Sequence, residues 1–384
     1  MISRFVLAVA LAALMVVTGV GSYMYLERHQ SRIAAPPQKP TQAPPRPNAF
    51  VLPGTLYFAQ AGAIYSYNAG RFHQLTAEDG WMQPSMTPDG NTLMTVKRGQ
   101  FYSDVWALTK FGTVEGKLTD NAGHGRCYGD TGANQWSFYP RLSADQKTIW
   151  MSYDGPKFVC LGFDDYNVNL SIWALPFGAP IDQGRSWTTP NDYTGGDVQP
   201  LPLPSGAIIY TKFSYDSDLN RVGQLWYTNR PGSAGRALTS TADDCMEPSL
   251  SPDGHEIAMI CTYGKQVSHL VIAPFDGSNL GALAAVVTDQ LVAQPTWAPD
   301  GSGIAYLAPS APDGPFQLWF LPRLAYHPPV PSPIPTPLPT PGGPYTGLLP
   351  TPTPILAPPP VVIKPIQMTT NLGFDATSPL SWAA

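Results

Sequence analysis

The sequence predicts an all-β protein: a six-bladed β-propeller closed by its C-terminal strand and preceded by an N-terminal transmembrane or signal-anchor helix. Three observations support this fold class. An eight-residue phrase recurs five times, each copy is followed by short apolar runs of strand length, and the two ends of the domain each hold part of one further unit. Repeats of roughly 40–50 residues with four short strands are typical of propeller blades.

The first 30 residues carry the predicted membrane segment. An apolar run extends from Phe5 to Leu26 after a single Arg4, and it is long enough to cross a hydrocarbon core of about 30 Å. The run either stays in the membrane as a signal anchor, which is the preferred interpretation, or is cleaved as a signal peptide near Gly19–Gly21. We therefore expect a single-pass cell-membrane protein with its propeller outside the cytoplasm, or a secreted protein if cleavage occurs.

Residues 31–52 are predicted to form a Pro-rich spacer before the folded domain. The segment Ala34–Pro53 reads AAPPQKPTQAPPRPNAFVLP. Proline lacks an N–H and fixes φ, so the segment is expected to be extended and semi-rigid. Recognition of the tract by a proline-binding partner is the alternative.

The recurring phrase opens five predicted blades. Its copies are QPSMTPDG, YPRLSADQ, QPLPLPSG, EPSLSPDG and QPTWAPDG, which start at Gln83, Tyr139, Gln199, Glu247 and Gln294. Their lead prolines lie 56, 60, 48 and 47 residues apart. The end of the phrase fits a tight hairpin turn, because Pro pre-sets φ, Asp bonds its own backbone and Gly takes a positive φ.

Three further runs follow each phrase and complete a four-stranded unit. The first is apolar, as in EIAMICTY at Glu256, and the last ends in Thr or Thr-Ser. Between them, one bulky side chain recurs in register in all six units: Tyr65, Trp106, Trp173, Trp226, Val271 and Trp319. This regularity favours core filling between blades over ligand contact.

The two parts of the domain, residues 53–326 and 364–384, complete each other. The first unit starts at Pro53 with a second strand, whereas Ser378–Trp382 resembles an opening phrase. Pro295 and Pro379 lie 84 residues apart, and leaving out the 37 residues of the Pro-rich tract 327–363 reduces this to the normal 47. The tract is therefore predicted to be an insertion in the last blade. Residues 364–384 then supply the last strand of blade 6 and the closing strand of blade 1.

The phrase P-x-[WL]-S-P-D-G, followed by a strand such as Ile-Ala and by Leu-Thr before the next unit, resembles the repeats of TolB-type propellers. The resemblance covers residues 53–326 and 364–384, and it implies a six-bladed ring without an attached hydrolase domain. The copies at Ala144-Asp145-Gln146 and Pro204-Ser205-Gly206 depart from the pattern. Because such propellers serve as scaffolds, as sensor domains and as substrate gates of prolyl peptidases, the resemblance implies the fold rather than one function.

The order of connections predicts which face of the disc meets a partner. Connections from second to third strand and between blades lie on one face; those from first to second and from third to fourth lie on the other. The spacer and the Pro-rich insertion both leave from the latter face. The long loops lie on the opposite face, where we expect a protein or envelope component to bind. Packing of the loop aromatics against each other is the alternative. The candidate side chains are Trp136, Asp164, Asp165, Tyr166, Tyr215 and Asp216.

Four cysteines, in a compartment that permits disulfides, are predicted to pair as Cys127–Cys160 and Cys245–Cys261. Counting back through the turn at Asp253 places Cys245 almost opposite Cys261, and Cys127 and Cys160 have the same relation through longer loops. Buried free thiols are the alternative.

Asp216, Asp218 and Asn220 have the spacing of oxygen ligands that opens a calcium loop. The Gly that should follow and the later Glu are missing. Solvated loop acids are therefore the preferred interpretation, and we predict no metal site and no cofactor.

The net charge and the sequence motifs argue against two classes of function. The net charge is −5 and no basic cluster occurs, so nucleic-acid binding is not expected. The sequence holds no G-x-S-x-G string, so a hydrolase nucleophile elbow is not expected. The prediction is a membrane-anchored binding module, a scaffold or sensor that is not an enzyme. The alternatives are a structural envelope protein that contacts the cell wall through its Pro-rich tracts, and a lyase or hydrolase site on the propeller itself.

Overall fold

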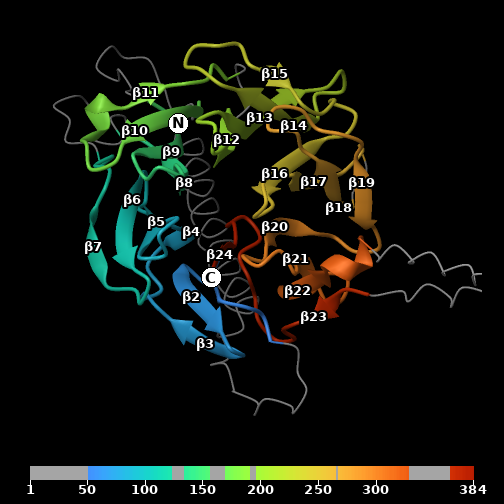
Figure 1. The fold of residues 1–384 in the computed structure, drawn as a ribbon. Coiled ribbons are helices and arrows are strands. Elements are labelled where there is room, and N and C mark those ends of the chain that lie inside the picture. The colour runs from blue at the N-terminus through green and yellow to red at the C-terminus, as the bar shows by residue number, and fades with distance from the viewer. Residues whose placement is uncertain (1–50, 123–133, 156–168, 191–195, 265–266, 328–363) are drawn as a thin grey trace, which may run out of the picture. The chain divides into compact units, whose positions relative to one another are not determined.

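The computed structural model describes residues 51–122, 134–155, 169–190, 196–264, 267–327 and 364–384. These residues form six antiparallel sheets of four strands each, arranged as blades around a central axis (Figure 1). The predicted six-bladed β-propeller is confirmed. Two single-turn 3-10 helices, η2 (Ile181–Gln183) and η3 (Arg323–Ala325), also occur in the described part of the chain.

Every blade runs from an innermost strand at the axis to a fourth strand at the rim. Blade 1 consists of β24 (Ser381–Ala383), β1 (Thr55–Gln60), β2 (Ala63–Asn68) and β3 (Arg71–Gln74). Blade 2 consists of β4 (Trp81–Met86), β5 (Thr92–Arg98), β6 (Ser103–Thr109) and β7 (Val114–Lys117). Blade 3 consists of β8 (Ser137–Leu142), β9 (Thr148–Tyr153), β10 (Ser171–Pro176) and β11 (Arg185–Ser186).

The other three blades follow the same order. Blade 4 consists of β12 (Asp197–Pro202), β13 (Ile208–Tyr215), β14 (Arg221–Thr228) and β15 (Arg236–Ala237). Blade 5 consists of β16 (Cys245–Leu250), β17 (Glu256–Cys261), β18 (His269–Pro274) and β19 (Ala284–Val287). Blade 6 consists of β20 (Ala293–Trp297), β21 (Gly303–Pro309), β22 (Phe316–Pro322) and β23 (Ile366–Gln367).

Blade 1 contains strands from both ends of the described domain. β24 pairs antiparallel with β1, with Trp382 opposite Leu56. The Trp382 indole N–H donates to the Pro53 carbonyl (2.6 Å), and its ring packs edge-on against Phe320 of blade 6. Because of this pairing, β1 is an interior strand of its sheet rather than an open edge.

The end of the repeated phrase builds the hairpin between the first two strands of a blade. In blade 5 the Ser251 hydroxyl donates to Asp253 (2.6 Å) and accepts the backbone N–H of Glu256 (2.9 Å), where β17 begins. Gly254 follows the Asp with a φ of 76°. In blade 3, Gln146 takes the place of this glycine with a φ of 59°, a left-handed conformation that is unfavourable for a residue with a Cβ.

The Thr near the end of each unit joins the third strand to the end of the fourth. In five blades its hydroxyl oxygen accepts a third-strand backbone N–H at 2.9–3.0 Å: Thr76 from Ile64, Thr119 from Val105, Thr188 from Ile172, Thr239 from Leu225 and Thr369 from Leu318. The fourth strands are only two to four residues long. The side-chain bond therefore extends a short ladder, and the recurring Thr is a structural feature of the blade.

Apolar side chains of neighbouring blades form the core. Leu225 of blade 4 packs in one buried cluster with Ile257 and Val271 of blade 5. The recurring third-strand aromatics pack partly buried against such clusters: Tyr65, Trp106, Trp173, Trp226 and Trp319. They fill the space between blades, as their spacing predicted.

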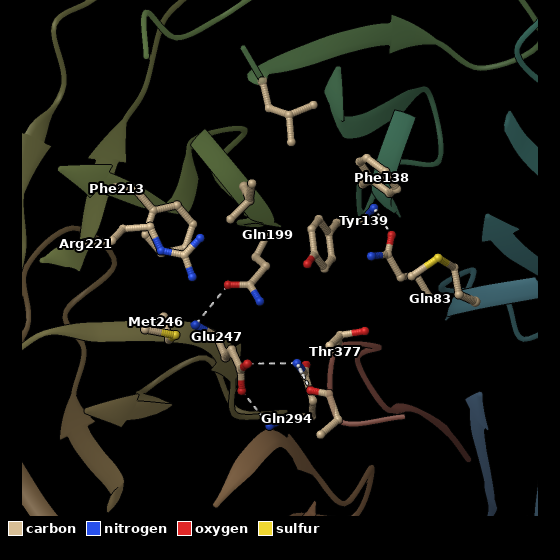
Figure 2. Close-up of a pocket in the computed structure, with 14 residues that line it drawn as sticks. Gln83, Phe138, Tyr139, Gln199, Phe213, Arg221, Met246, Glu247, Gln294 and Thr377 are labelled. Carbon is tan, nitrogen blue, oxygen red and sulfur yellow. Dashed lines mark hydrogen bonds between the residues drawn. The ribbon is translucent and has the colours of Figure 1, made fainter. Parts of the chain in front are cut away.

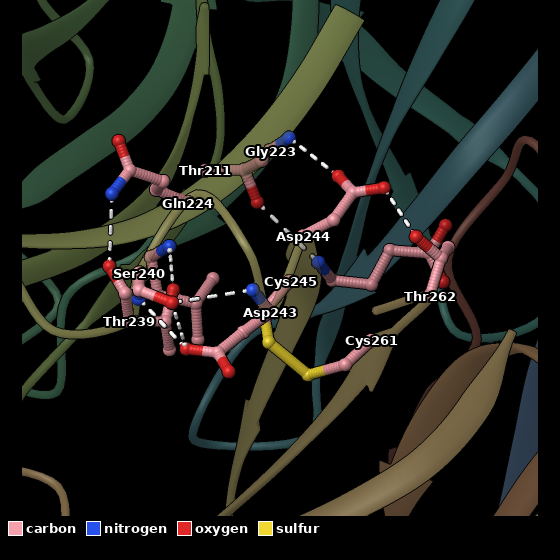
Figure 3. The surroundings of a disulfide bond; sticks show 12 residues. Thr211, Gly223, Gln224, Thr239, Ser240, Asp243, Asp244, Cys245, Cys261 and Thr262 are labelled. Carbon is pink, nitrogen blue, oxygen red and sulfur yellow. Dashed lines mark hydrogen bonds between the residues drawn. A yellow bond between two sulfur atoms is a disulfide. The ribbon is translucent and has the colours of Figure 1, made fainter. Parts of the chain in front are cut away.

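A disulfide joins the first two strands of blade 5 (Figure 3). Cys245 opens β16 directly opposite Cys261, the last residue of β17, and both side chains are fully buried. The neighbouring Asp244 carboxylate accepts the Gly223 N–H of blade 4 (2.6 Å). This bond links the start of β16 to the adjacent blade 4. The predicted Cys245–Cys261 bond is therefore present, whereas the predicted Cys127–Cys160 bond lies outside the described residues.

The predicted anchor and spacer, in residues 1–50, also lie outside the described residues, as do residues 328–363 of the Pro-rich tract. In the part of the chain that the structure describes, no helix is both long enough and apolar enough to cross a membrane.

Candidate functional site

A β-bulge interrupts the innermost strand of five blades. In blade 2 the pairing of β4 with β5 shifts register between Met82 and Ser85, and blades 3 to 6 show the same shift. The residue before the lead proline has a φ of 52–59° in all five: Gln83, Tyr139, Gln199, Glu247 and Gln294. Proline has no N–H for the ladder and is tolerated inside a strand at such bulges. In four of these bulges, the backbone N–H of the bulge residue donates to a side chain of the neighbouring blade.

These five residues form a hydrogen-bonded arrangement across blades, which we name the bulge ring (Figure 2). The side chain of one bulge residue accepts the backbone N–H of the next: Gln83 Oε1 from Tyr139 (2.7 Å), Gln199 Oε1 from Glu247 (3.1 Å) and Glu247 Oε2 from Gln294 (2.6 Å). In blade 1, Ser378 Oγ accepts from Gln83 (2.7 Å) in the same way. Gln294 Nε2 donates to Glu247 Oε1 (2.8 Å) and to the Ala376 carbonyl (3.0 Å).

The junction between blades 3 and 4 has a phenol where the other four bulge residues have an amide or a carboxylate. Its bulge residue is Tyr139, whose phenol points toward the space between the blades (Figure 2). Burial raises the pKa of the Tyr139 hydroxyl, and the negative charges of Glu247 and Asp375 raise it further. The phenol is therefore neutral at physiological pH and offers a hydrogen-bond donor to the space around it.

The bulge ring borders a cavity of about 390 Å³. The outer wall of this cavity is apolar. In most blades the residue just before the bulge residue is apolar and lines this wall, and two further apolar side chains lie beside these residues. We name this wall the collar; it consists of Met82, Phe138, Leu170, Val198, Phe213 and Met246. An apolar wall with a few fixed polar groups is the usual composition of a ligand site of this size.

The cavity lies at the connections between second and third strands. Phe213 is near the end of the second strand β13, and Arg221 begins the third strand β14. By contrast, Thr55 begins a second strand and Pro322 ends a third strand, so both lie on the opposite face. The start of β1 and the end of β22 therefore lie on the face away from the cavity.

Two arginines line the axial space at different depths. The exposed Arg221 stacks on Phe213 at the collar, 4.4 Å from the ring centroid. Arg141 comes two residues after Tyr139 on β8 and lines a smaller space of about 20 Å³, together with Pro248, Pro295 and Pro379. This smaller space shares four bulge residues with the large cavity and continues it inward. Burial lowers the pKa of the Arg141 guanidinium.

Glu247 is the acidic side chain that lines both spaces. Burial raises the pKa of its carboxyl to about 7, although the hydrogen bond from the Gln294 N–H acts in the opposite direction. The carboxyl therefore changes its charge within the physiological pH range.

The described binding residues that the sequence predicted do not line the cavity. Trp136 stacks on Phe138 of the collar at 5.8 Å, so packing explains it. Tyr215 is 48% exposed at the end of β13. Asp164, Asp165 and Tyr166 lie outside the described residues.

The Asp216 carboxylate stabilises a turn. Its Oδ1 accepts the backbone N–H groups of Asp218 (2.9 Å) and Asn220 (2.8 Å), and its Oδ2 accepts the Asn220 side chain (3.2 Å). These bonds lower the pKa of the Asp216 carboxyl. No group of three or more potential metal ligands is found within the described ranges.

The bulge ring and the collar were not predicted from the sequence, although the repeated phrase carried a signal. Its first letter reads Q, Y, Q, E and Q, so a polar side chain recurs before the lead proline in every copy. The turn chemistry explains only the end of the phrase. A polar residue at one fixed position of every blade indicates a shared location, which the structure identifies as the axis.

No protein-family model and no curated protein sequence matches the chain. Solved structures do resemble it. TolB from Acinetobacter baumannii is 17% identical with a TM-score of 0.52, over 71% of this chain and 62% of that one. A protein assigned as TolB from Agrobacterium tumefaciens is 15% identical with a TM-score of 0.49, over 72% and 86%. The match thus spans less than two thirds of the Acinetobacter protein. Together with the six-bladed arrangement, it shows that the chain has a TolB-like six-bladed β-propeller fold.

Proposed function

We propose that this protein is an extracytoplasmic binding module, anchored in the cell membrane through residues 5–26, that binds a protein partner in the cavity of its propeller. The observation that carries the proposal is the cavity itself, with its apolar collar above a polar ring. The collar offers apolar contact area, and the bulge ring offers a few fixed hydrogen-bonding groups. Ligand sites combine affinity and orientation in this way.

The two faces of the disc support an anchored arrangement. The chain enters at Thr55 and leaves toward the Pro-rich tract after Pro322, both on the face opposite the cavity. A membrane tether that is joined to this face leaves the cavity face accessible. Ring closure by β24, through its pairing with β1, would keep the cavity in one shape.

We propose no catalytic role for the ring. The carboxylate in the cavity accepts two hydrogen bonds from Gln294, so it already holds a structural position. The cations that line the space are Arg141 and Arg221, and arginine keeps its proton at physiological pH. Turnover of peptides or glycans by the full-length protein would contradict this part of the proposal.

Site-specific photo-crosslinking of the full-length protein in its own cells tests the binding face. A photoreactive residue at Met246, in the collar, is expected to capture one partner protein. The matched control is the same residue at Phe111, which is 76% exposed in the turn between β6 and β7 on the opposite face. Capture of the same protein at equal yield from both positions would reject the cavity as the binding site.

The anchor is tested separately by fractionation. The full-length protein is expected to stay in the membrane pellet after an alkaline carbonate wash. A variant in which a cleavable signal peptide replaces residues 5–26 is expected in the soluble fraction. Release of the full-length protein by carbonate would reject the anchor and leave the binding proposal intact.

A further inference from the structure

In the bulge ring, the side-chain oxygens of Gln83, Gln199 and Glu247 already accept hydrogen bonds. Several side-chain N–H and O–H groups of the ring, by contrast, donate to no described residue. Gln83 Oε1 accepts from Tyr139, and Gln199 Oε1 accepts from Glu247 and from the Thr211 hydroxyl. Both Glu247 oxygens accept from Gln294. The Nε2 groups of Gln83 and Gln199 and the hydroxyl of Tyr139 donate to no described residue. The cavity thus presents N–H and O–H groups, which suit a ligand rich in acceptors.

Arg141 adds a positive charge at the inner end of this space. The same position of the repeat holds an uncharged residue in every other blade: Ser85, Leu201, Ser249, Thr296 and Leu380. Arg141 forms no ion pair and no hydrogen bond with any residue that the structure describes. Its side chain lines the inner space together with four bulge residues and three prolines. Glu247 lines the same space, but its two oxygens accept hydrogen bonds from Gln294 rather than from Arg141.

Among the described residues, a buried and a half-buried lysine each have an acidic partner. The buried Lys212 bonds Asp197 at 3.1 Å, and the half-buried Lys117 bonds the buried Asp104 at 2.9 Å. Arg141 is partly buried, and a partly desolvated charge without an ion-pair partner is unfavourable. Arg141 departs from this pattern at the point where the propeller has a cavity open to the outside, so its counter-charge is expected to come with a ligand.

We propose that the axial space receives a carboxylate, bound by the Arg141 guanidinium and oriented by Tyr139 and Gln199, which line both parts of this space. A guanidinium and a carboxylate form two parallel hydrogen bonds, which makes Arg the side chain best suited to this group. The apolar collar lies outside the polar ring, so the ligand has an anionic tip and an apolar flank. The C-terminal end of a partner protein, with apolar residues before its terminal carboxylate, has this chemistry.

This inference rests on the proposed function, because it names the chemical group of the partner that the cavity binds. Calorimetric titration of the full-length protein with two dipeptide probes tests it. The probes are N-acetyl-Leu-Leu with a free carboxylate and the same dipeptide as its C-terminal amide. The acid is expected to bind at least tenfold more tightly than the amide. Equal affinity, or no binding of either probe, would overturn the inference.

Variants of two arginines on one blade locate the carboxylate site. Arg141→Gln is expected to weaken binding of the acid at least tenfold and to leave binding of the amide unchanged. Arg185→Gln, a matched change at an exposed position of the outer strand β11, is expected to change neither. Arg141→Lys retains the charge, so it should keep a weakened preference for the acid even if the Gln variant is unstable. An unchanged preference in a folded Arg141→Gln protein would overturn the assignment.

A third probe separates the two sources of a carboxylate. Isovalerate has the acid group and an apolar end but no peptide bond, and it is expected to bind at least tenfold more weakly than the dipeptide acid. Equal binding would replace the peptide terminus with a small free carboxylate. Failure of all probes, with partner capture retained at Met246, would reject the carboxylate and keep the binding function.

Discussion

Single residues of the repeated phrase have two separate roles. The Asp and Gly at its end form a turn, whereas the polar residue at its start belongs to the bulge ring. In the ring, Glu247 is the acidic member, and the other blades have Gln, Tyr or Ser at this position. This substitution gives one junction a titratable group that its neighbours lack.

The first prediction concerns this carboxyl. The pKa of Glu247 is raised to about 7 in the folded protein from an ordinary value of 4.5, so the folded state holds the proton more tightly than the unfolded state does. Its contribution to stability is therefore greatest at low pH and is lost as pH rises toward and through 7. We expect the melting temperature to fall between pH 5 and pH 8, and Glu247→Gln to flatten this decrease.

The control is Glu115→Gln, an exposed position on the rim strand β7, which should keep the wild-type slope. An unchanged pH dependence in the Glu247→Gln protein would contradict the burial of this carboxyl. The charged and titratable groups around Glu247 remain in both variants: Tyr139, Arg141, Arg221 and Asp375.

The second prediction concerns backbone strain at Gln146. This residue has a φ of 59° at the turn position where blades 2, 4, 5 and 6 have glycine. Gln146→Gly is expected to stabilise the protein by about 0.5–1 kcal/mol, because glycine adopts positive φ without a Cβ clash. Gly254→Ala, the reverse change at the equivalent turn of blade 5, should destabilise by a similar amount. Chemical denaturation measures both; a destabilised Gln146→Gly protein would contradict the turn geometry.

At the scale of the element, a blade of this protein has three ordinary strands and a very short fourth one. The Thr after the fourth strand bonds a backbone N–H of the third, so the outer part of the blade depends on a side chain. A buried N–H that loses its acceptor costs roughly 1–3 kcal/mol. The recurring Thr therefore stabilises the outer part of the sheet.

The third prediction tests this bond in blade 4. Thr239→Val keeps the shape of the side chain but removes the acceptor of the buried Leu225 N–H, now bonded at 3.0 Å. We expect a loss of about 1–2 kcal/mol in the free energy of unfolding. Thr241→Val, two residues along and exposed, should stay within about 0.5 kcal/mol of wild type. Equal effects would mean that the hydroxyl of Thr239 has no structural role.

The elements were largely predictable, and the site was not. Turn residues, strand-length apolar runs and the register of Trp106 and its equivalents follow from local chemistry, which a sequence displays directly. The pairing of Cys245 with Cys261 follows from counting through one hairpin. The bulge ring depends on which residues meet across blades, and its hydrogen bonds join positions 47 to 56 apart within the ring itself. Loop residues such as Asp216 and Tyr215 were therefore favoured over Gln83 and Glu247.

At the scale of the whole molecule, the ring depends on a junction between distant parts of the chain. β24 contributes three residues to the pairing with β1, and the Ser381 hydroxyl accepts the Met86 N–H of blade 2 (2.8 Å). The same short segment thus contacts blades 1 and 2 directly, and Trp382 reaches blade 6. We infer that it latches the ring closed.

The fourth prediction concerns this latch. Deletion of residues 379–384 removes β24 and leaves the β1 edge without a partner, so we expect a marked fall in melting temperature. Trp382→Ala keeps the strand but loses the bond to Pro53 and the packing on Phe320; it should cost about 3–5 kcal/mol at most. An unchanged melting curve for the deletion would show that the other five blades hold the ring without closure.

The position of β24 in the chain order also affects how the protein is made. Blades 2 to 6 precede this strand along the polypeptide, and β1 is synthesised more than 320 residues before its partner, as the sequence positions of Leu56 and Trp382 show. During synthesis, the nascent chain carries an unpaired strand edge that another nascent chain can join. We therefore expect association between nascent chains until the last residues emerge and β24 can pair with β1.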